Sequence, residues 1–293
     1  MHILMALLSA LAHSCGSVSL RTYQTKYQVS LADLRLYQCA RALLTGIGNL
    51  ILAGFCLRLD STGLALALCY GLDLTLTSIL TARCYTCGPM SVTSVITNAC
   101  VVMPIALGCL VYGETITPTR ILGFVFLTGC FLLSAINPGE KKKKDTQPIW
   151  YLLVFLAFFC NGMGAVLLNI YGRVAGSGER NSFLAIGYLV SGLLFLPGHF
   201  KAAKENSPVD PKQFLKPMVA LLVVVGSMGG FIGNGLLMSL NLSMPASVLY
   251  PLVNGGIAVI VAIISCIVFK EKLTLQRFFT ILLGLAAIVT LNL

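Results

Sequence analysis

Three ionisable residues lie inside long apolar runs of this sequence, where a charged side chain usually has a structural or functional role. Asp73 stands in the run Tyr70-Gly71-Leu72-Asp73-Leu74-Thr75, Arg41 lies about two turns into another run, and His13 lies in the middle of the first run. Ionisable side chains in a membrane core are costly, and they mark pathways for substrates or protons. These three residues are therefore the first candidates for chemistry.

Asp73 and His13 are the candidates for proton coupling. A carboxylate that faces a cavity can hold a proton or bind a substrate amine, and an imidazole can relay protons. Structural roles are equally open at this point. Asp73 can form an ion pair with Arg41 that joins two helices, or lie close to a loop, and His13 can be a hydrogen-bonded side chain between helices.

Uncharged polar and aromatic side chains complete a candidate substrate site. Carboxamides that converge on a cavity can bind a polar metabolite, and tyrosine rings can stack on it. The alternative is that the asparagines only join helices by hydrogen bonds, with neighbouring glycines allowing close approach. The candidate substrate-binding residues are Arg41, Tyr70, Asp73, Asn98, Asn161, Asn234, Tyr250 and Asn254.

Prolines and glutamates mark further positions along the apolar runs. Pro104 and Pro251 should kink their helices and are candidate hinges for a transport cycle, unless the bends are static. Glu114 and Glu271 stand at the ends of two runs. We expect them to pair at the membrane interface with Arg120, Lys272 or Arg277.

The composition requires membrane helices to position these residues. Of the 293 residues, 57% are hydrophobic and only 10% are charged, whereas a soluble domain carries about 25% charged residues. Continuous apolar runs of about twenty residues indicate membrane-spanning helices rather than strands. We expect an all-α integral membrane protein with about ten spans, near residues 2–20, 36–57, 63–82, 89–111, 119–137, 149–170, 182–198, 217–239, 245–269 and 274–292.

The net charge of +10 comes from basic residues in short loops. No basic helix stands outside the spans, so nucleic acid is not an expected partner. The loops after odd-numbered spans hold fifteen Lys and Arg residues, and those after even-numbered spans hold four. The positive-inside rule then predicts that the odd loops face the cytoplasm and that both termini lie outside.

Enzyme, metal and cofactor chemistry find little support in the sequence. No segment outside the spans is long enough to build a catalytic domain, and the HExxH, GxSxG and GxxxxGK[ST] patterns are absent. Most of the eleven cysteines lie in apolar runs, where cysteine behaves as a small hydrophobe. A single CxxC, Cys84 to Cys87, is a weak metal or redox signal, so we expect a protein that is no enzyme and has no metal or cofactor.

Polar landmarks recur in the same order in the two halves of the chain. The matched pairs are Pro89 and Pro245, Asn98 and Asn254, Glu114 and Glu271, Thr117 and Thr274, and Arg120 and Arg277. They predict a five-helix repeat in residues 1–137, a basic linker in 138–148 and a second repeat in 149–293. An odd number of spans per repeat makes the repeats inverted, which places a transporter's substrate site at the midplane between them.

Residues 2–20 lack the basic n-region and the clear cleavage site of a signal peptide. Gly16 and Tyr23 near this segment also match Gly164 and Tyr171 in the second half. We therefore expect the segment to be retained as the first helix.

The residues at the C-terminal end of each half carry a resemblance to a known family. The first half ends in Tyr112-Gly113-Glu114 followed by Arg120-Ile121-Leu122-Gly123, and the second in Phe269-Lys270-Glu271 followed by Arg277 and Gly284. With ten spans and a five-plus-five repeat, the chain resembles the EamA-type ten-helix members of the drug/metabolite transporter superfamily. Many members of that family are described with both termini in the cytoplasm, opposite to the charge count.

The resemblance implies a secondary active transporter of small polar metabolites, such as amino acids or sugars, that works by alternating access. We expect an exporter coupled to protons or to exchange, in a plasma membrane of the bacterial inner-membrane type. The alternative is a flippase for a lipid-linked substrate. The partners are then a small-molecule substrate and the lipid bilayer, and the sequence leaves open whether the chain is a monomer or a homodimer.

Overall fold

The computed structural model describes residues 1–27, 30–87, 93, 96–135, 147–204, 214, 216–268 and 275–291. Over these ranges the regular structure is helical, without a strand, which confirms the expected all-α fold. The elements are α1 (His2–Lys26), α2 (Leu31–Leu52), α3 (Ser61–Cys87), η1 (Ala99–Val101), α5 (Val102–Tyr112), α6 (Pro118–Ala135), α7 (Ile149–Val174), α8 (Ser177–Lys204), α9 (Pro217–Met228), η3 (Gly229–Gly233), α10 (Asn234–Leu240), α11 (Ala246–Val268) and α12 (Leu275–Leu291).

The lengths and compositions of the helices fit a multi-pass membrane protein. Within the described ranges, six helices are long and apolar enough to cross a membrane. They occupy His2–Lys26, Ser61–Cys84, Ile149–Val174, Gly178–Pro197, Pro217–Leu240 and Ala246–Ile264, and shorter apolar helices occupy Ile96–Tyr112, Pro118–Leu133 and Phe278–Leu291. With α2, these segments correspond to the ten expected spans.

Several helices extend further than their apolar runs. Residues 21–35 and 199–216 were expected outside the helical spans, yet α1 continues to Lys26, α2 begins at Leu31 and α8 continues to Lys204. The Ser30 hydroxyl caps α2 by accepting the N–H of Asp33 at 3.2 Å. Polar residues limit the part of a helix that can lie in hydrocarbon, but they do not end the helix. Residues 138–146 of the expected linker lie outside the described residues.

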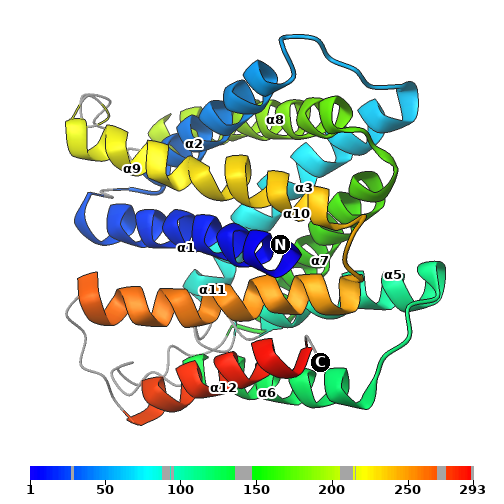
Figure 1. Ribbon diagram of the computed structural model, residues 1–293. Helices are drawn as coiled ribbons and strands as arrows, with labels where there is room; N and C mark the ends of the chain where they lie inside the picture. The colour runs from blue at the N-terminus through cyan, green and yellow to red at the C-terminus, as the bar shows by residue number, and fades with distance from the viewer. Residues whose placement is uncertain are drawn as a thin grey trace.

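The helices form a bundle with α1 in its middle (Figure 1). There α1 lies between the α9–α10 helix and α11. The pair α2 and α8 forms one edge of the bundle, and the pair α6 and α12 forms the opposite edge. Both ends of the chain lie on the same side, which we call the termini side. The other side is called the basic side, because α1 and α3 reach it close to Lys26 and Arg83.

Small residues allow α1 to occupy the centre. Its buried face includes Ala6, Ser9, Ala10, Ser14, Gly16 and Ser19. A Cβ on Gly16 would lie 3.3 Å from the backbone oxygen of Gly226, and the Ser9 hydroxyl donates to the backbone oxygen of Gly233 at 2.8 Å. The α9–α10 helix is interrupted beside α1 by η3, a π-helical turn from Gly229 to Gly233. Such turns are frequent at functional sites.

Helices α3 and α8 touch through their backbones. A Cβ on Gly71 would lie only 2.6 Å from the backbone oxygen of Gly187. One turn further along, the Thr75 hydroxyl donates to that of Ser191 at 3.0 Å. This contact fixes the face of α3 that carries Tyr70 and Asp73 relative to α8.

The two expected hinge prolines lie in different settings. Pro104 follows the 3-10 turn η1, as expected where proline cannot donate to the carbonyl one turn earlier. Pro251 is buried inside α11. Whether either position acts as a hinge stays a prediction.

Candidate functional site

A cavity of about 420 Å³ lies in the middle of the bundle. Side chains from α1, α2, α3, η1, α7, α8, η3, α10 and α11 line it. All nine residues proposed from the sequence for substrate binding or proton coupling are among them: His13, Arg41, Tyr70, Asp73, Asn98, Asn161, Asn234, Tyr250 and Asn254. Their position around one cavity is a structural fact, while their roles stay predictions.

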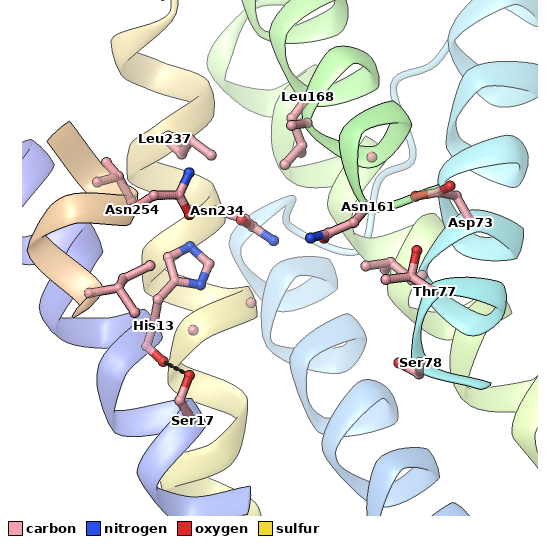
Figure 2. Close-up of a pocket in the computed structure, with 18 of the residues that line it drawn as sticks. His13, Ser17, Asp73, Thr77, Ser78, Asn161, Leu168, Asn234, Leu237 and Asn254 are labelled. Atoms are coloured by element: carbon pink, nitrogen blue, oxygen red, sulfur yellow. Dashed lines mark hydrogen bonds between the residues drawn. The ribbon is translucent and has the colours of Figure 1, made fainter. Parts of the chain in front are cut away.

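Asp73 projects from α3 into this cavity and is only 8% exposed. Within the described part of the chain, its carboxylate has no hydrogen bond and no ion pair. Gly164 of α7 leaves room for it, because a Cβ there would lie 2.6 Å from Asp73 Oδ2. Figure 2 shows Asp73 on the same helix as Thr77, whose buried hydroxyl also lacks a partner among the described residues.

Arg41 reaches the cavity from α2. Its stem lies against Gly226, where a Cβ would be 3.0 Å from Arg41 Cδ. The guanidinium is close enough to interact electrostatically with His13 and Tyr188. The ion pair with Asp73 that the sequence allowed does not form, and no hydrogen bond or ion pair of the Arg41 side chain occurs within the described ranges.

A hydrogen-bonded group lies on the cavity wall between these two charges. Asn234, the first residue of α10 after the π-helical turn, donates through Nδ2 to the Tyr70 hydroxyl at 3.0 Å and to the Tyr188 hydroxyl at 2.6 Å. The two rings meet edge to face, with centroids 6.0 Å apart. Side chains from three helices therefore hold one another in place.

His13 is enclosed by the glycines of η3. A Cβ on Gly229 would lie 3.2 Å from its Nδ1, and one on Gly233 would lie 2.7 Å from its Nε2. The imidazole also shares a hydrogen bond with Asn234. This arrangement supports the structural alternative for His13, a hydrogen-bonded side chain between helices, more directly than a role as a proton relay.

The other candidate asparagines combine local bonds with access to the cavity. Asn161 donates to the backbone oxygen of Thr97 at 3.0 Å, and Asn254 donates to that of Tyr250 at 3.0 Å. Figure 2 shows the amide groups of Asn161 and Asn234 pointing toward one another from opposite walls. A polar solute between them would meet carboxamides on both sides.

Toward the termini side, hydrogen bonds join α7, α10 and α11. The Tyr250 hydroxyl donates to the backbone oxygen of Ala165 at 2.9 Å. Asn241 donates to the backbone oxygen of Leu168 at 3.2 Å and accepts from Asn169 at 2.8 Å. In the opposite direction, the lining extends along α1 to Leu20 and along α3 to Ser78. The cavity thus extends toward the basic side.

A second polar group lies beyond these bonds, and we call it the Glu114 cluster (Tyr112, Glu114, Arg173, Ala246 and Ser247). Glu114 forms an ion pair with Arg173 at the end of α7. Its two oxygens accept the N–H groups of Ala246 at 2.9 Å and Ser247 at 3.1 Å, at the start of α11. The Arg173 guanidinium lies 3.9 Å from the centre of the Tyr112 ring.

The expectation that Glu114 pairs with Arg120 was wrong. Arg120, six residues after Glu114 in the sequence, instead donates to the backbone oxygen of Thr115 at 2.8 Å and to the Ser247 hydroxyl at 3.2 Å. The loop between α5 and α6 brings Glu114 to the start of α11, where free N–H groups and the helix dipole attract an anion. Glu271 lies outside the described residues, so its expected pairing at the membrane interface stays a prediction.

The surroundings of Glu114 favour its charged form. Burial alone would raise the pKa of this carboxyl, but the hydrogen bonds from Ala246 and Ser247, together with Arg173, outweigh burial and lower the pKa. A carboxylate at this position therefore stays ionised at neutral pH.

Some residues that line the cavity were not among the candidates from the sequence. Tyr188, Thr45 and Thr77 face the same cavity. Tyr188 follows Gly187 in the middle of an apolar run, so its polar hydroxyl at mid-span was the available signal. Cys84, the first cysteine of the CxxC pair, packs in an apolar cluster with Trp150 and is a free thiol.

Comparisons with known proteins identify the family. Residues 148–293 match the model of the EamA-like transporter family. Among solved structures with a matching fold is one described only as "Crystal structure of protein", with a TM-score of 0.73 and 12% sequence identity, over 99% of this chain and 97% of that one. A comparison with curated proteins gives no match. The chain, a multi-pass membrane protein of about ten helices, belongs to the EamA-like transporter family of the drug/metabolite transporter superfamily.

Proposed function

We propose that this protein is a secondary active transporter that exports small polar metabolites by alternating access, with the central cavity as its substrate site. The observation that carries the proposal is the convergence of nine polar and aromatic side chains on one cavity. Its volume of about 420 Å³ lies in the range of small-molecule sites. Polar side chains in a membrane protein that face a cavity, and not lipid, are those expected of a solute pathway.

Two further features support alternating access. The lining residues come from both predicted repeats, 1–137 and 149–293, so relative motion of the helices would change both walls of the cavity. The lining extends toward the basic side, and the hydrogen bonds of Tyr250 and Asn241 and the ion pair of the Glu114 cluster join helices toward the termini side. Opening on the termini side would require these bonds to break.

Energy coupling is assigned to Asp73. It is a buried carboxylate with no partner among the described residues, and a group of that kind exchanges a proton at small cost in surrounding structure. Proton or substrate exchange at this position would drive transport without ATP hydrolysis.

The test is untargeted mass spectrometry of cells that overexpress the chain, compared with empty-vector cells and with Asp73→Asn. Medium, cytosol and lipid extract are measured separately. A polar metabolite enriched in the medium, and not in the mutant, supports export, and one enriched in the cytosol supports import. A change confined to the lipid extract supports lipid flipping instead, and no change in any fraction contradicts the proposal.

We place the protein in a bacterial-type plasma membrane with its basic side toward the cytoplasm. The charge count of the loops supports this orientation. A reporter active only outside the cytoplasm, fused to the C-terminus, is then expected to be active. A silent reporter, together with a fluorescent cytoplasmic one, would reverse the orientation.

A further inference from the structure

An acidic and a basic side chain line the central cavity without meeting. Asp73 on α3 is 8% exposed, and Arg41 on α2 is partly buried. In the described part of the structure neither side chain has a hydrogen bond or an ion pair. Charged groups removed from water are normally paired, so each of these two charges lacks the partner that its environment demands.

The cavity wall keeps the two charges apart. Helix α8 packs against both α2 and α3, and its Tyr188 interacts electrostatically with Arg41. Tyr70 lies one turn before Asp73, and Asn234 holds the Tyr70 and Tyr188 hydroxyls together. Arg41 and Asp73 thus belong to different helices, and the hydrogen-bonded side chains of Tyr70, Tyr188 and Asn234 lie between them.

A ligand can supply the hydrogen-bonding partners that Arg41 and Asp73 lack. An anionic group on Arg41 and an ammonium group on Asp73 would each form a charge-assisted hydrogen bond in a site of low dielectric. A neutral sugar would leave both charges unpaired. A simple anion would leave Asp73 unpaired, and a simple cation would leave Arg41 unpaired.

We propose that the cavity selects zwitterions, with Arg41 binding the carboxylate of the substrate and Asp73 binding its ammonium group. The proposal rests on the proposed transport function and names its substrate class. The neutral groups between the charges, which are Tyr70, Tyr188 and Asn234, hold Arg41 and Asp73 at a fixed separation. The distance between the two charges of the best substrate therefore reports that separation.

The test uses purified full-length protein in proteoliposomes loaded with subsaturating mixtures. One mixture holds common α-amino acids and short ω-amino acids. A second holds their amides, which lack the carboxylate, and a third holds the corresponding hydroxy acids, which lack the ammonium group. Neutral sugars form a fourth. Release is measured by mass spectrometry against empty liposomes.

The wild-type protein is expected to release at least one amino acid about tenfold faster than its amide and its hydroxy acid, since an unpaired buried charge penalises each analogue. Arg41→Gln should lower release of the amino acid about tenfold and remove the discrimination against the amide. Asp73→Asn should remove the discrimination against the hydroxy acid. A purely structural role of either residue would lower all substrates alike.

Matched controls separate charge from folding. Arg41→Lys and Asp73→Glu keep the charges and should retain part of the preference. Arg58→Gln and Glu179→Gln remove exposed charges outside the cavity and should change nothing. Size-exclusion profiles show whether each variant folds.

Equal release of an amino acid, its amide and its hydroxy acid would overturn the zwitterion assignment while leaving transport intact. Release of sugars alone would do the same. If no mixture is released, the zwitterion assignment is wrong, and the cellular metabolite profile decides separately whether the transport proposal also fails.

Discussion

The central cavity and the Glu114 cluster treat charge in opposite ways. In the cavity, Arg41 and Asp73 face open space with no partner in the described structure. In the Glu114 cluster, the carboxylate accepts two backbone N–H groups and pairs with Arg173. Both groups join elements from the two predicted repeats, and both consist of residues that lie far apart in the sequence.

The difference separates two uses of polar residues in a membrane protein. A charge whose hydrogen-bonding capacity is filled by protein stabilises one conformation. A charge left unpaired at the edge of a cavity costs stability, and only a bound proton or ligand can compensate it. Substitutions in the Glu114 cluster should therefore affect stability first, and substitutions in the cavity should affect transport first.

The largest expected effect is on transport in Asp73→Asn. Asparagine cannot carry a proton, so transport driven by a proton gradient should fall to the level of empty liposomes. Counterflow exchange at saturating substrate should persist, because the amide oxygen still accepts a hydrogen bond. Uptake in proteoliposomes, with and without a pH gradient, measures both. Gradient-driven uptake that equals the wild type would rule out Asp73 as the coupling group.

A large effect on stability is expected for Glu114→Gln. The change leaves Arg173 without its counter-charge and should lower stability by about 2 kcal/mol. Thermal unfolding in detergent measures it, with the exposed Glu179→Gln as control. Asp73→Asn should leave the unfolding temperature unchanged or raise it. If Asp73→Asn unfolds at a lower temperature than Glu114→Gln, the proposed difference between the central cavity and the Glu114 cluster is wrong.

The contribution of Glu114 should also depend on pH. Its pKa is lowered in the folded protein, so its charge stabilises the fold above the pKa of a glutamate in the unfolded chain, about 4.3. That contribution is lost as the pH falls through the lower pKa of the folded state. The difference in unfolding temperature between wild type and Glu114→Gln should shrink below about pH 4. A difference that widens on acidification would contradict the ionised assignment.

The smallest expected effect is that of Tyr188→Phe. It removes the hydroxyl that accepts from Asn234 at 2.6 Å, and a lost hydrogen bond of this kind costs about 1 kcal/mol. The apparent KM for transport should rise roughly fivefold with little change in maximal rate. Tyr151→Phe, on a side chain that is 65% exposed, is the matched control. Equal effects of the two changes would remove Tyr188 from the site.

The sequence predicted the fold and the members of the cavity for one physical reason. A polar side chain inside a long apolar run must turn away from lipid, so residues such as Asp73, Asn161 and Asn234 converge on the interior of the bundle. Helix type and number follow from the same runs. The division into two inverted repeats stays a prediction.

The partners of individual residues could not be predicted in the same way. Glu114 and Arg173 meet because the loop after α5 lies beside the starts and ends of helices from the other half, a path that no local pattern records. The π-helical turn before Asn234 has no simple signal beyond its glycines. Helix ends such as Lys26 and Lys204 exceeded the apolar runs, because hydropathy marks hydrocarbon thickness rather than helix length.

The backbone contact between α3 and α8 bears on which helices are expected to move together. At Gly71 and Gly187 no layer of side chains lies between the two helices, and a hydrogen bond from Thr75 to Ser191 joins them one turn further along. Asp73 on α3 and Tyr188 on α8 are therefore expected to move together in the proposed transport cycle. This pair combines a helix that precedes residues 138–148 with one that follows them, so the unit expected to move together does not coincide with either half of the sequence.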